Sequence, residues 1–312
     1  MARWARKPID VAGRAGGWLL EQPYLLLTLT SLFWAGSIVL GRFASGQIPP
    51  VTLAFIRWSG AFFVVLPFAW PHLKRDWPLI RRHWLLMTVL SLTGISAYNT
   101  LAYWGLQYTE ALNALLLQST NPLHIAFWTF LLNGVRLTRA QAAGILVSLV
   151  GVIVIICRGD PTVLTTIGIN QGDLWMIAAL TTNGIYSALL QRRPAMHPVS
   201  FLSFTIGWGA CLLLPLLVWE LATVSVMQVT SSNVAVLVYM ILFPALIAYL
   251  FYNRGLELIG PNRAAPFLHL IPVFGSALAI LFLGEVLSLY HAVGYALVLA
   301  GIITATRRSA ER

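Results

Sequence analysis

The chain contains ten apolar runs, each close to the roughly 20 residues that an α-helix needs to cross the hydrocarbon core of a bilayer. Strands of a membrane β-barrel would be about half as long and would alternate in polarity, which these runs do not. Of the 312 residues, 58% are hydrophobic and 10% are charged, whereas soluble domains carry about 25% charged residues. The sequence therefore predicts an all-α membrane protein with ten transmembrane helices, at residues 24–44, 51–70, 84–104, 111–132, 138–157, 173–190, 199–219, 233–253, 261–283 and 288–306.

The net charge of +10 follows the connections between these segments. Of the 20 Lys and Arg residues, 17 lie at the two termini and in every second connection, while the other connections hold only Arg42 and Arg158. Cytoplasmic loops of membrane proteins carry such an excess of basic residues. The pattern predicts an even number of spans with both termini in the cytoplasm. It assigns the charge to membrane topology and not to nucleic-acid binding.

The sequence repeats itself. A shift of 150 places Gly105 on Gly255 and Pro122 on Pro272, and a shift of 148 places Gly36 on Gly184. Repeated Gly and Pro matches in one register predict two copies of a five-helix unit, at residues 1–157 and 172–312. Because five is odd, the second copy enters the membrane from the opposite side and is inverted. Inverted repeats are typical of secondary transporters, which bind substrate near the midplane where the halves meet.

Two stretches, GLQYTEALNALLLQSTNPL and FLGEVLSLYHAVGYALVLAGI, resemble the signature segments of EamA-type carriers in the drug/metabolite transporter superfamily. The resemblance covers nearly the whole chain and implies a ten-helix carrier with a central cavity lined by the third, fourth, eighth and ninth helices. Within that family the sequence is similar to exporters of aromatic amino acids. It implies a bacterial inner-membrane exporter of aromatic and other neutral amino acids, facilitative and working by alternating access.

Other functions stay open. A carrier of another small metabolite or drug with the same fold would differ only in its cavity lining, and a passive channel would conduct without saturation. A membrane enzyme would need a nucleophile and base, metal ligands or paired carboxylates at one depth, and the sequence indicates none. We expect no cofactor and no metal site. The partners expected are the amino-acid substrate and the lipid bilayer, and the protein is expected to be a monomer or a weak homo-oligomer.

The fourth segment is polar at its centre, LLLQSTNPLHIAFW at 115–128. Gln118 and Asn121 are three residues apart and share a helix face, and Pro122 bends a helix because it lacks an N–H. We interpret this stretch as a cavity wall with a hinge at Pro122; hydrogen bonding between packed helices is the alternative. In the repeat, Pro272 is the matching hinge, and His269 occupies the position of Ser119. We interpret His269 as a candidate substrate-binding residue; the alternative is that its imidazole only hydrogen-bonds to a backbone carbonyl.

Aromatic and polar residues of other segments complete the predicted site. Tyr98 and Asn99 come from SAYNTLAYWG in the third segment and Tyr249 from the eighth, with Trp34 and Trp175 as candidates for holding an aromatic side chain. In the same stretch Tyr103 and Trp104 lie near the segment end, where an interfacial aromatic belt is expected.

Charged groups are almost absent from the predicted spans. Arg57 is the one basic residue inside a span; its head could snorkel outward or face the cavity. We interpret it as structural, with carboxylate binding as the alternative. No Asp or Glu lies centrally in any segment, which argues against exchange of a drug for protons and leaves uniport or coupling through His.

Overall fold

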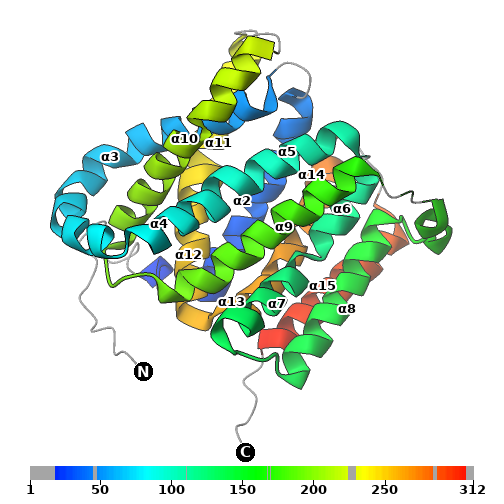
Figure 1. Cartoon of the computed structure of the whole chain (residues 1–312). Helices are drawn as coiled ribbons and strands as arrows, with labels where there is room; N and C mark the ends of the chain where they lie inside the picture. The colour runs from blue at the N-terminus through cyan, green and yellow to red at the C-terminus, as the bar shows by residue number, and fades with distance from the viewer. Residues whose placement is uncertain are drawn as a thin grey trace, which may run out of the picture.

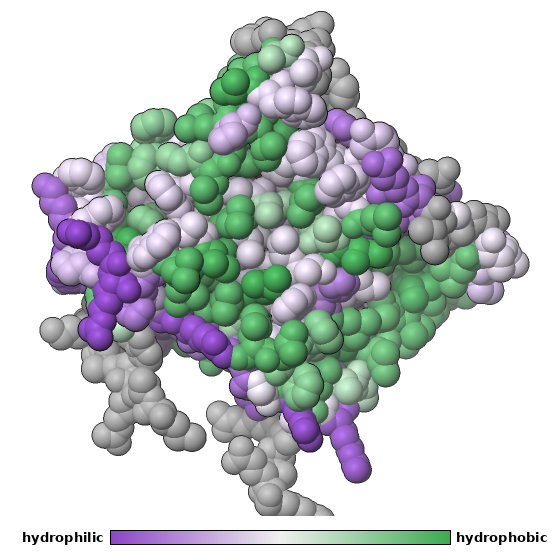
Figure 2. Space-filling view, viewed as in Figure 1, coloured by the Kyte–Doolittle hydropathy of each residue, from purple (hydrophilic) through white to green (hydrophobic). Residues whose placement is uncertain are grey.

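The computed structural model describes residues 18–44, 48–109, 111–166, 168, 170–223, 230–283 and 287–306. These residues form a bundle of helices with no strand among them (Figure 1). The predicted locations of the termini fall outside the described residues. Large apolar side chains such as Phe63, Phe68 and Leu281 are exposed, and in Figure 2 patches of hydrophobic residues lie among near-neutral ones on the face, with the most hydrophilic residues mainly near its edges. A surface of this kind suits a lipid environment.

Helices occupy each of the apolar runs of the first half. The elements are α2 (Pro23–Ala44), α3 (Pro50–Arg82), then α4 (Trp84–Ser91), the π-helical segment η1 (Leu92–Ala97) and α5 (Tyr98–Tyr108), then α6 (Ala111–Ser119) and α7 (Asn121–Asn133), and α8 (Arg139–Ile156). A 3₁₀ segment, η2 (Pro161–Thr166), follows in the connection to the second half.

The second half follows the same order. It contains α9 (Gln171–Leu189) with the short η3 (Leu190–Arg192), α10 (Pro198–Thr223), then α11 (Ser231–Met240), π-helical η4 (Ile241–Ile247) and α12 (Ala248–Ile259), then α13 (Pro261–Ala264), 3₁₀-helical η5 (Ala265–His269) and α14 (Leu270–Leu283), and α15 (Leu289–Thr306). Within the described residues, six helices are long and apolar enough to cross a membrane: Pro50–Arg82, Trp84–Gly105, Arg139–Ile156, Pro198–Thr223, Ser231–Ile259 and Leu289–Thr306.

The irregular segments occur at matching positions of the two halves. The shift of 150 places the π-helical residues 92–97 on 242–247, which lie within η4. The same shift places the interruption between α6 and α7, at Thr120, next to η5, which ends at His269. The repeat therefore extends from sequence to backbone distortions.

Glycines bring the last helices of the two halves, α8 and α15, into close contact (Figure 1). A Cβ added at Gly144 would lie 2.5 Å from the carbonyl oxygen of Gly301, and one added at Gly151 would lie 2.8 Å from that of Gly294. The shift of 150 exchanges these two contacts, since it maps 144 onto 294 and 151 onto 301. The helices run antiparallel, as an inverted repeat predicts, and the glycine faces pack within one chain.

The second helices of the halves, α3 and α10, also pack antiparallel, and each caps the other with a carboxylate. Glu220 near the end of α10 accepts from the Val51 and Thr52 backbone N–H groups at 2.9 and 2.6 Å. Asp76 near the end of α3 accepts from the His197 N–H at 2.9 Å, just before α10 begins. Carboxylates are favourable at helix N-termini because the unpaired N–H groups carry partial positive charge.

Candidate substrate site

The two π-helical segments lie on either side of a polar and aromatic centre. Their carbonyl groups are open to side-chain donors because the regular hydrogen-bond ladder is interrupted there. The Tyr249 hydroxyl donates to the Gly94 carbonyl of η1 at 2.7 Å, and the Trp34 indole N–H donates to the Pro244 carbonyl of η4 at 3.1 Å. Asn99 Nδ2 donates to the carbonyl of Ile95 at 3.3 Å. Three residues predicted from sequence thus meet where α2, α5 and α12 converge.

Aromatic rings pack beside this centre. The Tyr249 ring contacts Trp34 and Trp58 with centroid distances of 5.6 and 5.0 Å, both edge to face. Trp34 also contacts Tyr252 at 5.1 Å. Such pairs contribute ~0.5–1.5 kcal/mol each beyond burial. The sequence analysis missed Trp58, although its place beside Arg57 in an apolar run was an available signal.

Arg57 points into this centre and is only 4% exposed, so its head does not snorkel to the membrane interface. Its terminal nitrogens donate to Asn99 Oδ1 at 3.5 Å, to the Tyr103 hydroxyl at 3.4 Å and to the Pro244 carbonyl at 3.3 Å. The guanidinium lies 4.7 Å from the Trp58 ring centroid. The hydroxyl of the partly buried Tyr103 therefore points toward Arg57, and its place in the interfacial belt stays a prediction.

These contacts only partly offset the cost of burying the Arg57 charge. A cation over an aromatic ring gains ~0.5–2 kcal/mol, and the three hydrogen bonds are long. An arginine costs ~2.5–3.5 kcal/mol or more at the centre of a membrane helix, and Arg57 lies about two turns from the start of α3. Nε of Arg57 is buried and finds no hydrogen-bond partner among the residues that the structure describes. Part of the hydrogen-bonding capacity of Arg57 is thus unused among the described residues.

A second group of polar contacts links the interrupted fourth and ninth helices. Gln118 Nε2 donates to the Tyr98 hydroxyl at 2.9 Å. His269 is buried, with Nε2 2.7 Å from the Ser119 carbonyl oxygen and Nδ1 2.6 Å from the Ser148 hydroxyl. Because a carbonyl can only accept, Nε2 carries the proton, and in the neutral ring Nδ1 accepts from Ser148.

The contact between His269 and Ser119 joins equivalent positions of the two repeats, since the shift of 150 maps one onto the other. Leu123 N–H bonds to Thr120 instead of Ser119, so the interruption of the helix leaves the Ser119 carbonyl for the imidazole. A small cleft lies here, lined by Leu115, Gln118, Ser119, Leu268, His269, Ile271 and Pro272.

The two candidate hinges begin the second piece of their helices. Pro122 is the second residue of α7, and Pro272 is the third residue of α14. At these positions the missing N–H removes no intrahelical bond. The interruptions therefore lie just before the prolines, at Thr120 and in η5.

Asn121 and Trp175 contact other partners. Asn121 Oδ1 accepts from Asn183 Nδ2 at 3.0 Å, and both side chains are buried between α7 and α9. This is the kind of bond between packed helices that the sequence left open as the alternative. The Trp175 ring packs edge to face on Trp104, with centroids 6.0 Å apart.

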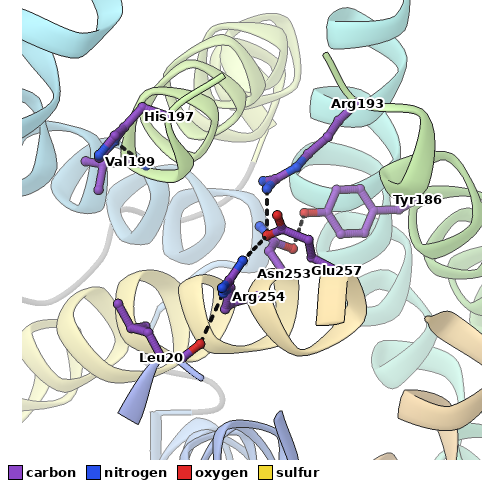
Figure 3. Close-up of polar contacts among 8 residues, drawn as sticks. All are labelled: Leu20, Tyr186, Arg193, His197, Val199, Asn253, Arg254 and Glu257. Carbon is purple, nitrogen blue, oxygen red and sulfur yellow. Dashed lines mark hydrogen bonds and ion pairs between the residues drawn. The ribbon is translucent and has the colours of Figure 1, made fainter. Parts of the chain in front are cut away.

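A polar network joins α9 and α12 at the end of the bundle where α10 begins (Figure 3). The Tyr186 hydroxyl donates to Asn253 Oδ1 at 2.7 Å. Beyond it, Glu257 accepts from Arg193 at 2.8 Å and lies 3.1 Å from Arg254. The sequence analysis did not single out these residues. Their spacing along two different helices carries no local signal, and only packing brings them together.

The geometry can be set beside known proteins. The model of the EamA-like transporter family matches this chain twice, at residues 22–157 and 170–307. The chain belongs to the EamA-like transporter family. It is therefore a multi-pass membrane transporter, with one family unit in each half.

Relatives within the family span nearly the same length. The chain is 25% identical over 287 residues to the uncharacterized transporter YyaM of Bacillus subtilis (strain 168), covering 91% of this chain and 93% of that protein. It is 29% identical over 235 residues to a probable terminal-alkyne amino-acid exporter of Streptantibioticus cattleyicolor, covering 73% and 74%. A crystal structure with 22% identity matches the fold with a TM-score of 0.71, covering 91% of this chain and 96% of that one.

Proposed function

We propose that this EamA-family transporter exports aromatic and other neutral amino acids across the bacterial inner membrane. The observation that carries the proposal is the centre between the two π-helical segments, where Trp34 and Tyr249 pack beside Asn99 and the Tyr98–Gln118 pair. Binding sites for small molecules combine apolar walls with a few oriented polar groups. The 29% identical relative described as a probable terminal-alkyne amino-acid exporter supports an amino-acid substrate.

The proposed topology has ten spans, both termini in the cytoplasm, and two inverted units at residues 1–157 and 172–312. The symmetric irregularities support it, because an inverted repeat can exchange the conformations of its halves. Pro122 and Pro272 act as hinges next to the interruptions in the fourth and ninth helices. Export is facilitative: the substrate gradient sets the direction of transport.

In this proposal the network in Figure 3 closes the cytoplasmic end. Besides the Tyr186–Asn253 bond, Ser187 and Tyr252 share a hydrogen bond of 2.9 Å between α9 and α12. Opening to the cytoplasm separates these two helices and breaks the bonds. The repeat does not duplicate them, because the shifts place Ile38 and Tyr103 at the positions of Tyr186 and Asn253.

The test is uptake into proteoliposomes of labelled Trp, Phe, Leu, a sugar and a cationic dye, with and without a pH gradient. The expected result is saturable entry of Trp and Phe at a rate that does not depend on the pH gradient. Asn99→Ala and Gln118→Ala should weaken substrate affinity, while Gln107→Ala, at an exposed position of α5, serves as the matched control. Entry of the dye or sugar alone would overturn the substrate class and favour a carrier of another metabolite with this fold.

A further inference from the structure

Arg57 has no anionic partner among the described residues. Five described carboxylates are engaged elsewhere: Glu220 and Asp76 cap helices, Asp173 caps α9, Asp160 accepts from Thr162 and Glu257 pairs with Arg193. The three acceptors of Arg57 are uncharged, and its Nε has none. A buried guanidinium in a membrane protein ordinarily pairs with another charge or with backbone carbonyls, or marks a substrate path; Arg57 has one such carbonyl, that of Pro244.

We propose that the missing counter-ion is the carboxylate of the transported substrate, and this inference rests on the proposed function. A guanidinium binds a carboxylate through two parallel N–H···O bonds. The Trp58 ring, 4.7 Å from the guanidinium carbon, holds the plane of Arg57 while its neutral partners stay at 3.3–3.5 Å. A carboxylate that takes the place of Asn99 Oδ1 and the Tyr103 hydroxyl forms shorter, charge-assisted bonds.

The position of Arg57 also orients the rest of the ligand. Trp58 and Trp34 both contact the ring of Tyr249, so aromatic surface lies directly beside the guanidinium. A ligand held by its carboxylate has its side chain next to these rings. Arg57 thereby makes the carboxylate, and not the ammonium, the indispensable group of the substrate.

The first test compares three competitors against labelled Phe: unlabelled Phe, 3-phenylpropionate, which lacks the ammonium, and phenethylamine, which lacks the carboxylate. In the wild type, 3-phenylpropionate should compete and phenethylamine should not. Arg57→Gln should lose about ten- to hundredfold in affinity for both carboxylates, the effect expected of a hydrogen bond to a charged group. Arg57→Lys should restore little of this affinity, because an ammonium cannot form the two parallel hydrogen bonds of a guanidinium. Arg139→Gln removes an exposed arginine and is the matched control.

Asn99→Asp is a second variant that tests the inference even if Arg57→Gln fails to fold. It places a carboxylate where Oδ1 now lies, 3.5 Å from Arg57. The built-in counter-ion should raise Tm and abolish competition by 3-phenylpropionate. An Asn99→Asp protein that keeps this competition, or an Arg57→Gln protein that binds Phe and 3-phenylpropionate as tightly as the wild type, would overturn the inference.

Failure of the proposed function gives a different result. If Phe is not transported but 3-phenylpropionate raises the Tm of the wild type and not of Arg57→Gln, the amino-acid assignment is wrong and the anion site stands. If no aromatic carboxylate, including Phe, changes Tm or transport in the wild type, the anion site itself is refuted.

Discussion

The antiparallel contact between α8 and α15 predicts the effect of one methyl group at Gly301. A Cβ there would lie 2.5 Å from the Gly144 carbonyl oxygen and 2.6 Å from the Ser148 backbone nitrogen. Ordinary contacts of this kind begin at 3.4 Å, so the helices must separate by about 0.5–0.9 Å, since well-packed interiors leave no slack. A gap of that size forfeits a quarter to a half of each dispersion contact along the interface.

Overpacking of this kind costs ~1–3 kcal/mol. The gain in helix propensity from Gly to Ala, at most ~1 kcal/mol, offsets part of it. Gly301→Ala should therefore destabilise the protein by about 1–2 kcal/mol, a fall in Tm of roughly 2–8 °C at ~2–4 °C per kcal/mol.

Scanning fluorimetry of the detergent-purified protein measures this, because the chain contains 12 Trp residues. Gly275→Ala in α14 is the matched control, since its added Cβ would meet nothing within 4 Å. It should leave Tm unchanged or slightly raised. A Gly301→Ala protein as stable as Gly275→Ala would refute the close approach of the two helices and the packing argument built on it.

Three further predictions follow from other parts of the molecule. Glu220→Gln removes the charge that caps α3 and should destabilise the folded protein by ~1–2 kcal/mol. The Tm of this variant is compared with that of Glu220→Asp, which keeps the charge. An unchanged Tm would contradict the capping role. Burial, reinforced by the stacked ring of His72, lowers the pKa of His197 below 6.5. Because the unfolded chain then binds more protons than the folded one, Tm should fall as the pH drops below about 6.5. His197→Gln should flatten this dependence of Tm on pH. Ser187→Cys in a Cys211→Ser background places a thiol under the network of Figure 3. Adding Glu257→Gln should speed the reaction of this thiol with a thiol-reactive label, because it weakens the ion pairs of that network. Equal labelling rates with and without Glu257→Gln would show that the ion pairs do not hold this end closed.

The sequence located the helices well because burial in lipid is a local requirement. Each apolar run must satisfy its own backbone hydrogen bonds, so length and hydrophobicity are enough to predict a helix. The Gly and Pro matches predicted the repeat for a related reason: these residues mark close approaches and interruptions, and Gly144 and Gly301 do meet. Pro244 and Pro122 likewise lie in or beside irregular segments.

The site was predicted less completely because a polar side chain in a helix has several possible partners. Asn121 and Gln118 lie three residues apart, yet one bonds to Asn183 and the other to Tyr98. Tyr103 sits near a helix end but turns inward to Arg57. Neither choice is encoded within the segment, since each depends on which neighbouring helix supplies the hydrogen-bond partner.

The sequence by itself indicated that this chain lies in lipid, that it consists of two related halves, and that no Asp or Glu lies centrally in a predicted span. The tertiary structure alone decided that His269 meets the carbonyl of its own repeat counterpart, Ser119, and that the Arg57 guanidinium lies over the Trp58 ring with no carboxylate partner in the described part of the chain. The physical reason is the range of the interactions. Hydrophobicity and helix formation act along the chain, whereas the compensation of a buried charge or carbonyl is settled between helices that only folding brings together.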